Sequence, residues 1–121
     1  MNGLYVDTLK HGNWVEFICT GTLTLEEAIG LGIQIREEML KDPATDHVLV
    51  DVTRARVQMN MMQRFQLGEY IAKELAHLRI AIVAAAGDIN KMLEDTAVNR
   101  GASLHATHDR ENALSWLGQI T

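Results

Sequence analysis

Four polar residues with side chains suited to binding an anion follow an apolar run near the middle of the chain. Asp51, Thr53, Arg54 and Arg56 stand at the end of the run 47–52. Arginines beside a helix N-terminus can hold a carboxylate or a phosphate, which predicts a polar ligand pocket. In the other interpretation Asp51 and Thr53 bond the loop backbone and both arginines face solvent. Polar residues are expected at strand ends, which favours this second interpretation.

A cluster of flexible apolar residues comes next in the chain. Met59, Met61 and Met62 precede Phe65, and Asn60 is a residue type that caps helices. Methionine-rich surfaces bind apolar ligands or partner helices. Met61 and Phe65 share one helical face, so we expect them to fill the core. If the cluster is exposed instead, it indicates a contact with a partner or with a second copy.

Other kinds of chemistry find little support in the residues. Cys19 is the only cysteine, which excludes an internal disulfide, and its apolar neighbours indicate an inert buried thiol, with a catalytic nucleophile as the alternative. His105 and His108 would point to opposite faces of an extended strand. Neither G-x-G-x-x-G nor G-x-x-x-x-G-K-[ST] occurs. We therefore expect no catalytic residue, no metal site and no cofactor.

Length and charge narrow the class of protein further. With 121 residues the chain is long enough for one core, so we expect a single domain over residues 1–121. The formal net charge of -5 disfavours nucleic acid or an anionic membrane as a general partner. No run of about 18 apolar residues occurs, which predicts no integral membrane segment and a cytoplasmic setting.

The elements that must position these residues can be predicted from periodicity and turn chemistry. Apolar runs without alternation are typical of strands buried on both faces, as in parallel sheets covered by helices. The predicted order is ββαβαβαβα, an α/β fold with a mixed sheet of about five strands and four helices. The predicted strands are 4–9, 14–20, 47–52, 79–86 and 103–107, and the predicted helices are 25–41, 61–75, 89–99 and 109–119.

Two details of these elements concern packing. Val15, Phe17 and Cys19 fall on one face of the second strand. Gly30 and Gly32 interrupt the first helix, where each costs about 1 kcal/mol relative to alanine. We expect close packing against the sheet to be the reason for these glycines.

The element order, the strand Val48-Leu49-Val50-Asp51-Val52-Thr53 and two segments near the C-terminus resemble a known family. The segments are Ala97-Val98-Asn99-Arg100-Gly101 and Glu111-Asn112-Ala113-Leu114-Ser115-Trp116-Leu117. Together they resemble the STAS domain of SpoIIAA-like anti-sigma-factor antagonists, in the branch that shares the fold of CRAL-TRIO lipid-binding domains. The resemblance covers nearly the whole chain, but its motifs are packing motifs, so it implies a fold rather than an activity.

The chain departs from this family at the position that matters for regulation. The resemblance implies a phosphorylatable serine at the start of the helix after the central strand. The corresponding residues here are 59–62, Met-Asn-Met-Met, and no hydroxyl stands between Thr53 and Met62. Asn60 keeps the capping role, and a phosphorylation switch at this position is not expected.

These observations predict a non-enzymatic, cytoplasmic, STAS-like regulatory or interaction module that lacks the phosphorylatable serine. It would bind a protein or a small ligand, with no partner identified by the sequence and with a homodimer left open. One alternative is a carrier or sensor of a lipid or other small apolar ligand, which requires an enclosed apolar cavity of about 300 Å3. A second alternative is an enzyme that uses Asp51 or a histidine as base. The candidate binding residues are Asp51, Thr53, Arg54, Arg56, Asn60, Met61 and Phe65.

Overall fold

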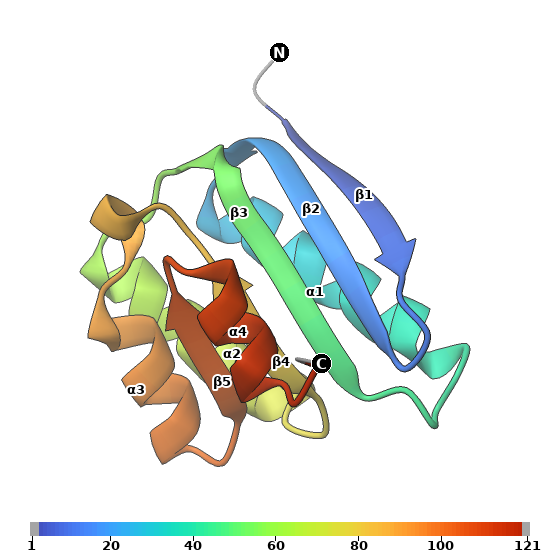
Figure 1. Cartoon of the computed structure of the whole chain (residues 1–121). Coiled ribbons are helices and arrows are strands. Elements are labelled where there is room, and N and C mark those ends of the chain that lie inside the picture. The colour runs from blue at the N-terminus through green and yellow to red at the C-terminus, as the bar shows by residue number, and fades with distance from the viewer. Residues whose placement is uncertain (1–2, 120–121) are drawn as a thin grey trace.

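A five-stranded sheet in the order β1-β2-β3-β4-β5 forms the centre of the molecule (Figure 1). The computed structural model describes residues 3–119. β1 and β2 are antiparallel, and β2 to β5 are mutually parallel. The elements are β1 Leu4–Lys10, β2 Trp14–Leu23, α1 Leu25–Leu40, β3 His47–Val57, α2 Met61–Glu74, β4 Arg79–Val83, a short 3-10 helix Ala86–Asp88, α3 Lys91–Asn99, β5 Ser103–Thr107 and α4 Arg110–Trp116. The predicted α/β class and element order are confirmed.

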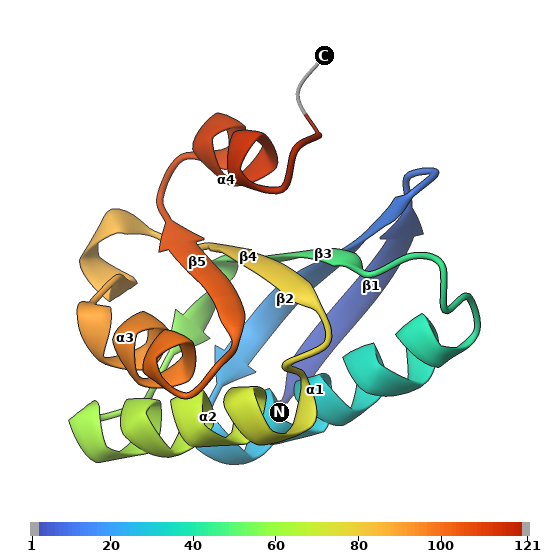
Figure 2. The same cartoon turned by 90° about the horizontal axis from the view of Figure 1, so that it is seen from below.

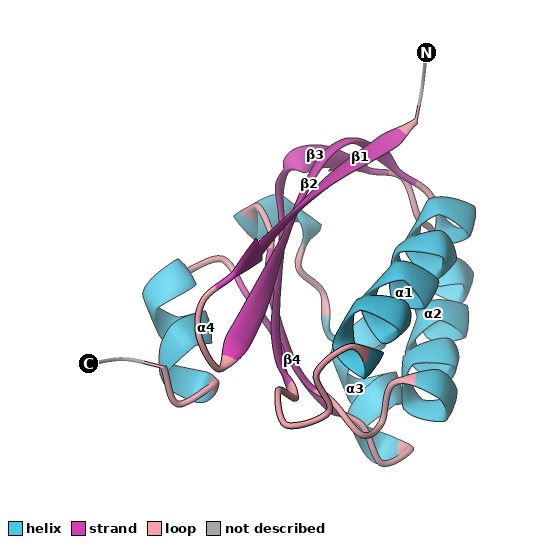
Figure 3. Ribbon diagram, turned by 90° about the vertical axis from the view of Figure 1, so that its right-hand side faces the viewer, coloured by secondary structure: helices cyan, strands magenta, loops and turns pink. Residues whose placement is uncertain are grey.

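The helices divide unequally between the two faces of the sheet. Figure 3 shows α1, α2 and α3 on one face and α4 on the other. Each of the first three helices connects two neighbouring parallel strands, and the sheet grows in one direction. Crossovers of the same hand then place all three helices on the same face. No described strand follows α4, which packs on β4 and β5 and leaves the same face of β1 and β2 largely uncovered (Figure 1).

Two apolar cores result from this arrangement, and β3 contributes to both. Val48 and Val50 point into the larger core beneath α1, α2 and α3, whereas Leu49 points into a smaller core beneath α4. In β2, Phe17 and Cys19 are fully buried in the larger core, as the alternation of that strand predicts. The apolar run of β3 therefore has the pattern expected of a strand covered on both faces.

β3 is longer than predicted and contains a bulge. The residues expected to start a loop after position 52 continue as strand to Val57. Ile18 pairs with Asp51 and Thr20 with Arg54, so β3 holds one extra residue relative to β2 at this point. Beyond the bulge Ala55 lies in the larger core and Arg54 and Arg56 are exposed on the uncovered face. The strand continues because its partner β2 also continues, and one solvated face accepts polar residues.

Other predicted element ends also differ from the structure, among them that of β2, which extends to Leu23 rather than ending at residue 20. β4 ends at Val83 rather than at residue 86, although the Ala84 amide still donates to the Thr107 carbonyl. α3 begins at Lys91 rather than at residue 89, because Asn90 caps it, its side chain accepting from the Met92 amide. α4 ends at Trp116 rather than near residue 119.

Gly30 and Gly32 have different surroundings, which gives a matched test of α1. A Cβ at Gly30 would meet no heavy atom within 4 Å, whereas a Cβ at Gly32 would lie 2.5 Å from Cε2 of Tyr70. The close approach at Gly32 is thus to α2 and not, as expected, to the sheet. We expect Gly30→Ala to stabilise the protein by about 1 kcal/mol, since alanine restricts the unfolded chain and favours the helix. Gly32→Ala should lose that gain by displacing Tyr70, and urea unfolding of both variants would measure the difference.

Candidate functional site

Asp51 and Thr53 bond to each other at the bulge of β3. The Asp51 Oδ1 atom accepts from the Thr53 amide at 2.9 Å and from the Thr53 hydroxyl at 2.6 Å. A bulge removes ladder partners from the extra residue, and this carboxylate supplies one. Within residues 3–119 neither Arg54 nor Arg56 forms an ion pair, and both are exposed. This arrangement agrees with the interpretation in which Asp51 and Thr53 bond the local backbone and both arginines face solvent. These residues do not form an enclosed pocket.

Asn60 caps α2, as expected from the sequence. Its Oδ1 accepts from the Gln63 amide at 2.8 Å, and the Gln63 Oε1 accepts from the Asn60 amide at 3.0 Å. This reciprocal capping box satisfies two of the backbone donors at the helix start. The Asn60 side chain is thereby engaged in holding the helix.

The methionines at the start of α2 are exposed, so the expected place of Met61 in the core is wrong. Met61 is 54% and Met62 is 64% exposed. Together with the partly buried Phe65 and with Met92 of α3 they line one shallow apolar hollow, which we call the methionine patch. Figure 2 shows α2 beside α3, with the start of α2 projecting beyond the strands. Core contacts of α2 begin only at Leu67.

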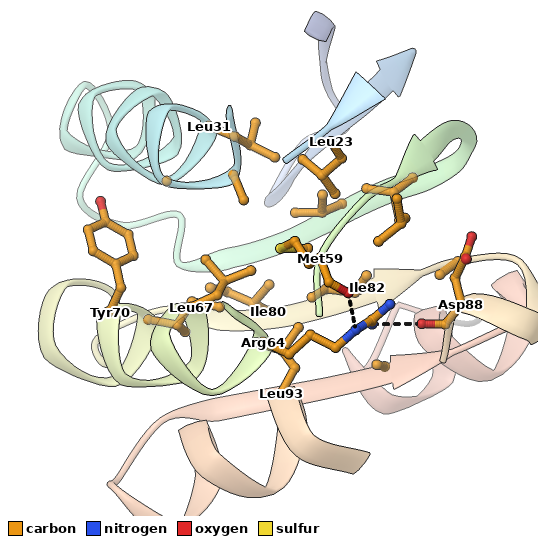
Figure 4. A pocket seen from close by; sticks show the side chains of 18 of the residues that line it. Leu23, Leu31, Met59, Arg64, Leu67, Tyr70, Ile80, Ile82, Asp88 and Leu93 are labelled. Atoms are coloured by element: carbon orange, nitrogen blue, oxygen red, sulfur yellow. Dashed lines mark hydrogen bonds between the residues drawn. The ribbon is translucent and has the colours of Figure 1, made fainter. Parts of the chain in front are cut away.

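An apolar cavity, here called the α2 cavity, lies between α2, α1 and the sheet. Its volume is about 90 Å3. Most of its lining is apolar, and the polar exceptions include Asn90. Arg64 and Asp88, also among them, stand together on one side of the cavity (Figure 4). A carrier of long acyl chains needs about 300 Å3, so such a ligand does not fit the cavity as it stands.

Arg64 is the residue of this region that sequence reasoning did not single out. Its Nη1 donates to the Asp88 carbonyl oxygen at 2.9 Å and its Nε donates to the Met59 carbonyl oxygen at 3.3 Å (Figure 4). It thereby links the β3–α2 connection to the β4–α3 connection. By helical periodicity Arg64 falls on the polar face of α2, and the one sequence signal for a role near the strand ends is its position one turn after the Asn60 cap.

A buried ion pair lies on the opposite face of the sheet. Glu16 of β2 is 2% exposed, and its carboxylate accepts from Nη1 of Arg110 at 2.6 Å and from Nη2 at 2.9 Å. His11 Nε2 lies 2.9 Å from Oε1 of Glu16. The hydrogen bonds from Arg110 lower the pKa of Glu16 below its usual 4.5, although burial opposes this effect. The carboxylate stays charged and joins β2 to α4.

The burial of Cys19 tests the alternative in which its thiol is a catalytic nucleophile. Cys19 is fully buried, and burial raises the pKa of its thiol to about 12. A thiol with this pKa remains protonated at neutral pH, which argues against the nucleophile alternative.

Within residues 3–119 no group of three or more His, Cys, Asp or Glu side chains is placed to hold a metal ion. In the same part of the chain, no helix combines the length and apolar character needed to span a bilayer.

Comparison with solved structures identifies the architecture. No protein-family model matches the chain, and no curated protein matches it at a significant level. An uncharacterized protein of the DUF3478 family from Shewanella loihica PV-4, described with a SpoIIAA-like fold, matches 97% of this chain and 95% of its own length at a TM-score of 0.51 and 18% identity. The chain has the SpoIIAA-like fold. An anti-sigma factor antagonist from Mycobacterium paratuberculosis also matches, over 97% of this chain and 96% of its own, at a TM-score of 0.64 and 12% identity.

Within the SpoIIAA-like fold, the start of α2 is the position at which the resemblance implies a phosphorylatable serine. Here it carries Asn60, Met61 and Met62, with the Asn60 side chain held in the capping box. The sequence identities of 18% and 12% establish the fold alone. What the chain does must therefore be argued from the methionine patch and the α2 cavity.

Proposed function

We propose that this chain is a non-enzymatic regulatory module that binds a protein partner through the methionine patch. The observation that carries the proposal is the exposure of Met61 and Met62 beside Phe65 and Met92. Methionine adapts its shape to apolar partners, and contiguous exposed apolar side chains mark interaction sites. The structural likeness to an anti-sigma factor antagonist, a class defined by a protein partner, supports this proposal.

The partner should present apolar side chains to the methionine patch. The guanidinium of Arg100 lies 5.1 Å from the centroid of the Phe65 ring, which places a cation at the border of the patch. Lys91 precedes Met92 at the start of α3 and is exposed. Both cations are paired within the chain, Arg100 with Glu69 at 3.8 Å and Lys91 with Glu94 at 3.5 Å, so apolar contact rather than charge should dominate the binding. Without a hydroxyl at 59–62, the contact would not be switched by phosphorylation at that position.

The groups with displaced pKa values support a non-enzymatic role. Glu16 is engaged with Arg110, and the Cys19 thiol is buried and protonated. Neither group lines the α2 cavity or the methionine patch. Tyr70 does line the cavity, but burial raises its pKa, so its hydroxyl remains protonated. A buried, reduced thiol and the acidic composition also suit the cytoplasm, where we place the protein.

The experiment is affinity capture from lysate of the source organism with quantitative mass spectrometry. We expect Met62→Asp to reduce recovery of the partner about tenfold, because a charge enters an apolar contact. An aspartate in the first turn of α2 is compatible with the helix dipole, so the fold should persist. Leu40→Asp in α1 is the matched control, because Leu40 is equally exposed at 64% and lies outside the patch.

Two outcomes would contradict the proposal. Equal recovery by Met62→Asp and by Leu40→Asp would show that the patch is not the contact. If light scattering finds that the unmodified chain is a dimer and Met62→Asp is a monomer, the patch belongs to self-association.

A further inference from the structure

We propose that the α2 cavity binds a short-chain aliphatic carboxylate, with its tail in the cavity and its carboxylate on Arg64. This site is separate from the methionine patch, because the two share no lining residue. The proposal therefore does not depend on the proposed function.

The cavity is larger than an ordinary packing defect, and its mainly apolar walls are poorly suited to holding water. Protein cores leave few voids larger than one water molecule, and a water needs polar partners to occupy one. This void measures about 90 Å3, and its walls are mainly aliphatic. The apolar lining comes from α1, α2, α3 and the sheet, including Leu31, Leu67, Ile71, Ile82 and Leu93.

The volume of the cavity limits the size of the ligand. A dry cavity of about 150 Å3 accommodates benzene, with six carbon atoms. By the same ratio, 90 Å3 accommodates about four carbon atoms. The tail should therefore be that of butyrate or a similarly short acid, and a longer acyl chain is excluded.

Arg64 provides the polar end of the site. Its guanidinium donates only to main-chain carbonyl oxygens, those of Met59 and Asp88, among the contacts of the described residues. A guanidinium has five N–H donors, and a carboxylate would form charge-assisted bonds with the donors that these two contacts leave free. The Asp88 carboxylate is turned away from the guanidinium in Figure 4, so it leaves these donors to a ligand.

The location of this end of the cavity also suits an anion. Met59 follows β3, and Asp88 follows β4, so both belong to connections that leave the carboxyl ends of parallel strands. Ligands of open α/β sheets gather at this edge. The N-terminal ends of α2 and α3 lie at the same edge and add a favourable potential for negative charge.

The test is a titration of the full chain with sodium butyrate, followed by methyl NMR spectra. We expect saturable shifts at the methyl groups that line the cavity, among them Leu31, Leu67 and Ile82. Butanol, which has the same tail without the charge, should bind more weakly, and octanoate should not enter. Arg64→Gln should weaken butyrate binding about tenfold and leave butanol binding unchanged.

Two further variants complete the test. Arg56→Gln is the matched control, because Arg56 is an exposed arginine outside the cavity lining, and it should change neither affinity. Ala28→Leu should fill the cavity and abolish binding of both compounds. Shifts that do not saturate, equal binding of butyrate and butanol, or an unchanged affinity in Arg64→Gln would each overturn the proposal, whether or not Ala28→Leu folds.

Discussion

Gly68→Val is expected to destabilise the protein by about 3 kcal/mol, because α2 and α3 touch at this residue. A Cβ at Gly68 would lie 2.8 Å from the Thr96 Cβ and 3.0 Å from the Leu93 carbonyl oxygen. One of these atoms belongs to the backbone of α3, so a side-chain rotation cannot relieve the overlap. The two helices would separate, and Met92 would move away from Phe65. The methionine patch thus depends on a glycine outside it.

A size swap across this contact provides the control. Gly68→Ala alone should destabilise despite the better helix propensity of alanine. Adding Thr96→Gly removes the nearest side-chain atoms and should recover part of the loss, beyond the separate effects of the two changes. Urea unfolding of the single and double variants gives this coupling energy. Simple additivity would contradict the proposed contact between the helices.

Arg110→Ala is expected to cost about 2 kcal/mol at pH 7, because it leaves the Glu16 carboxylate buried without its main partner. Loss of one partner from a fully buried pair costs about 3–5 kcal/mol, but the Arg110 side chain is 44% exposed, so solvent screening reduces the effect here. The variant also frees α4 from β2. Unfolding can be followed by the fluorescence of Trp14 in β2 and Trp116 in α4, which both pack against the smaller core.

The cost of Arg110→Ala should depend on pH in a defined direction. The folded pKa of Glu16 is lowered from 4.5, so the stability that it contributes is present above pH 4.5 and is lost as pH falls through the lower folded value. Without Arg110 that pKa should rise, because its main lowering cause is gone and only His11 still opposes the effect of burial. The difference in stability between the two proteins should therefore shrink as pH falls below about 4.5.

The exposed pair of Arg36 and Glu74 is the matched control for this prediction. Their side chains are 53% and 30% exposed, with 2.9 Å between Nη1 and Oε2. Arg36→Ala should cost less than about 1 kcal/mol. Equal costs for Arg36→Ala and Arg110→Ala would contradict a structural role for the buried pair.

The fold was predictable because its signals are local or periodic. The cap of α1 at Thr24 and that of α2 at Asn60 involve residues three positions apart, which a sequence displays directly. Phe17 and Cys19 lie in the larger core and Trp14 packs against the smaller one, because successive side chains of a strand point to opposite faces of the sheet. β3 shows a continuous apolar run because its alternate side chains enter the larger and the smaller core in turn.

The candidate site was predictable only in part, because its geometry depends on where the end of one element lies relative to its neighbours in space. The helical period places Met61 and Phe65 on one face of α2, but it does not say that the first turn projects beyond the sheet, where Met61 meets solvent. The length of β3 depends on its partner β2, which keeps Arg54 in a strand. Such relations join segments that no short window of sequence contains.

The sequence by itself determined the order of the elements, the caps of α1 and α2 and the alternation of buried faces in the strands, since these depend on neighbours within a few residues. Tertiary structure decided the rest. Glu16 meets Arg110 across a separation of 94 residues. Arg64 reaches the Asp88 carbonyl only because β3 and β4 are adjacent in the sheet. The methionine patch and the α2 cavity exist because α1, α2 and α3 pack on one face, and close packing alone determines which surfaces remain uncovered and which spaces remain unfilled.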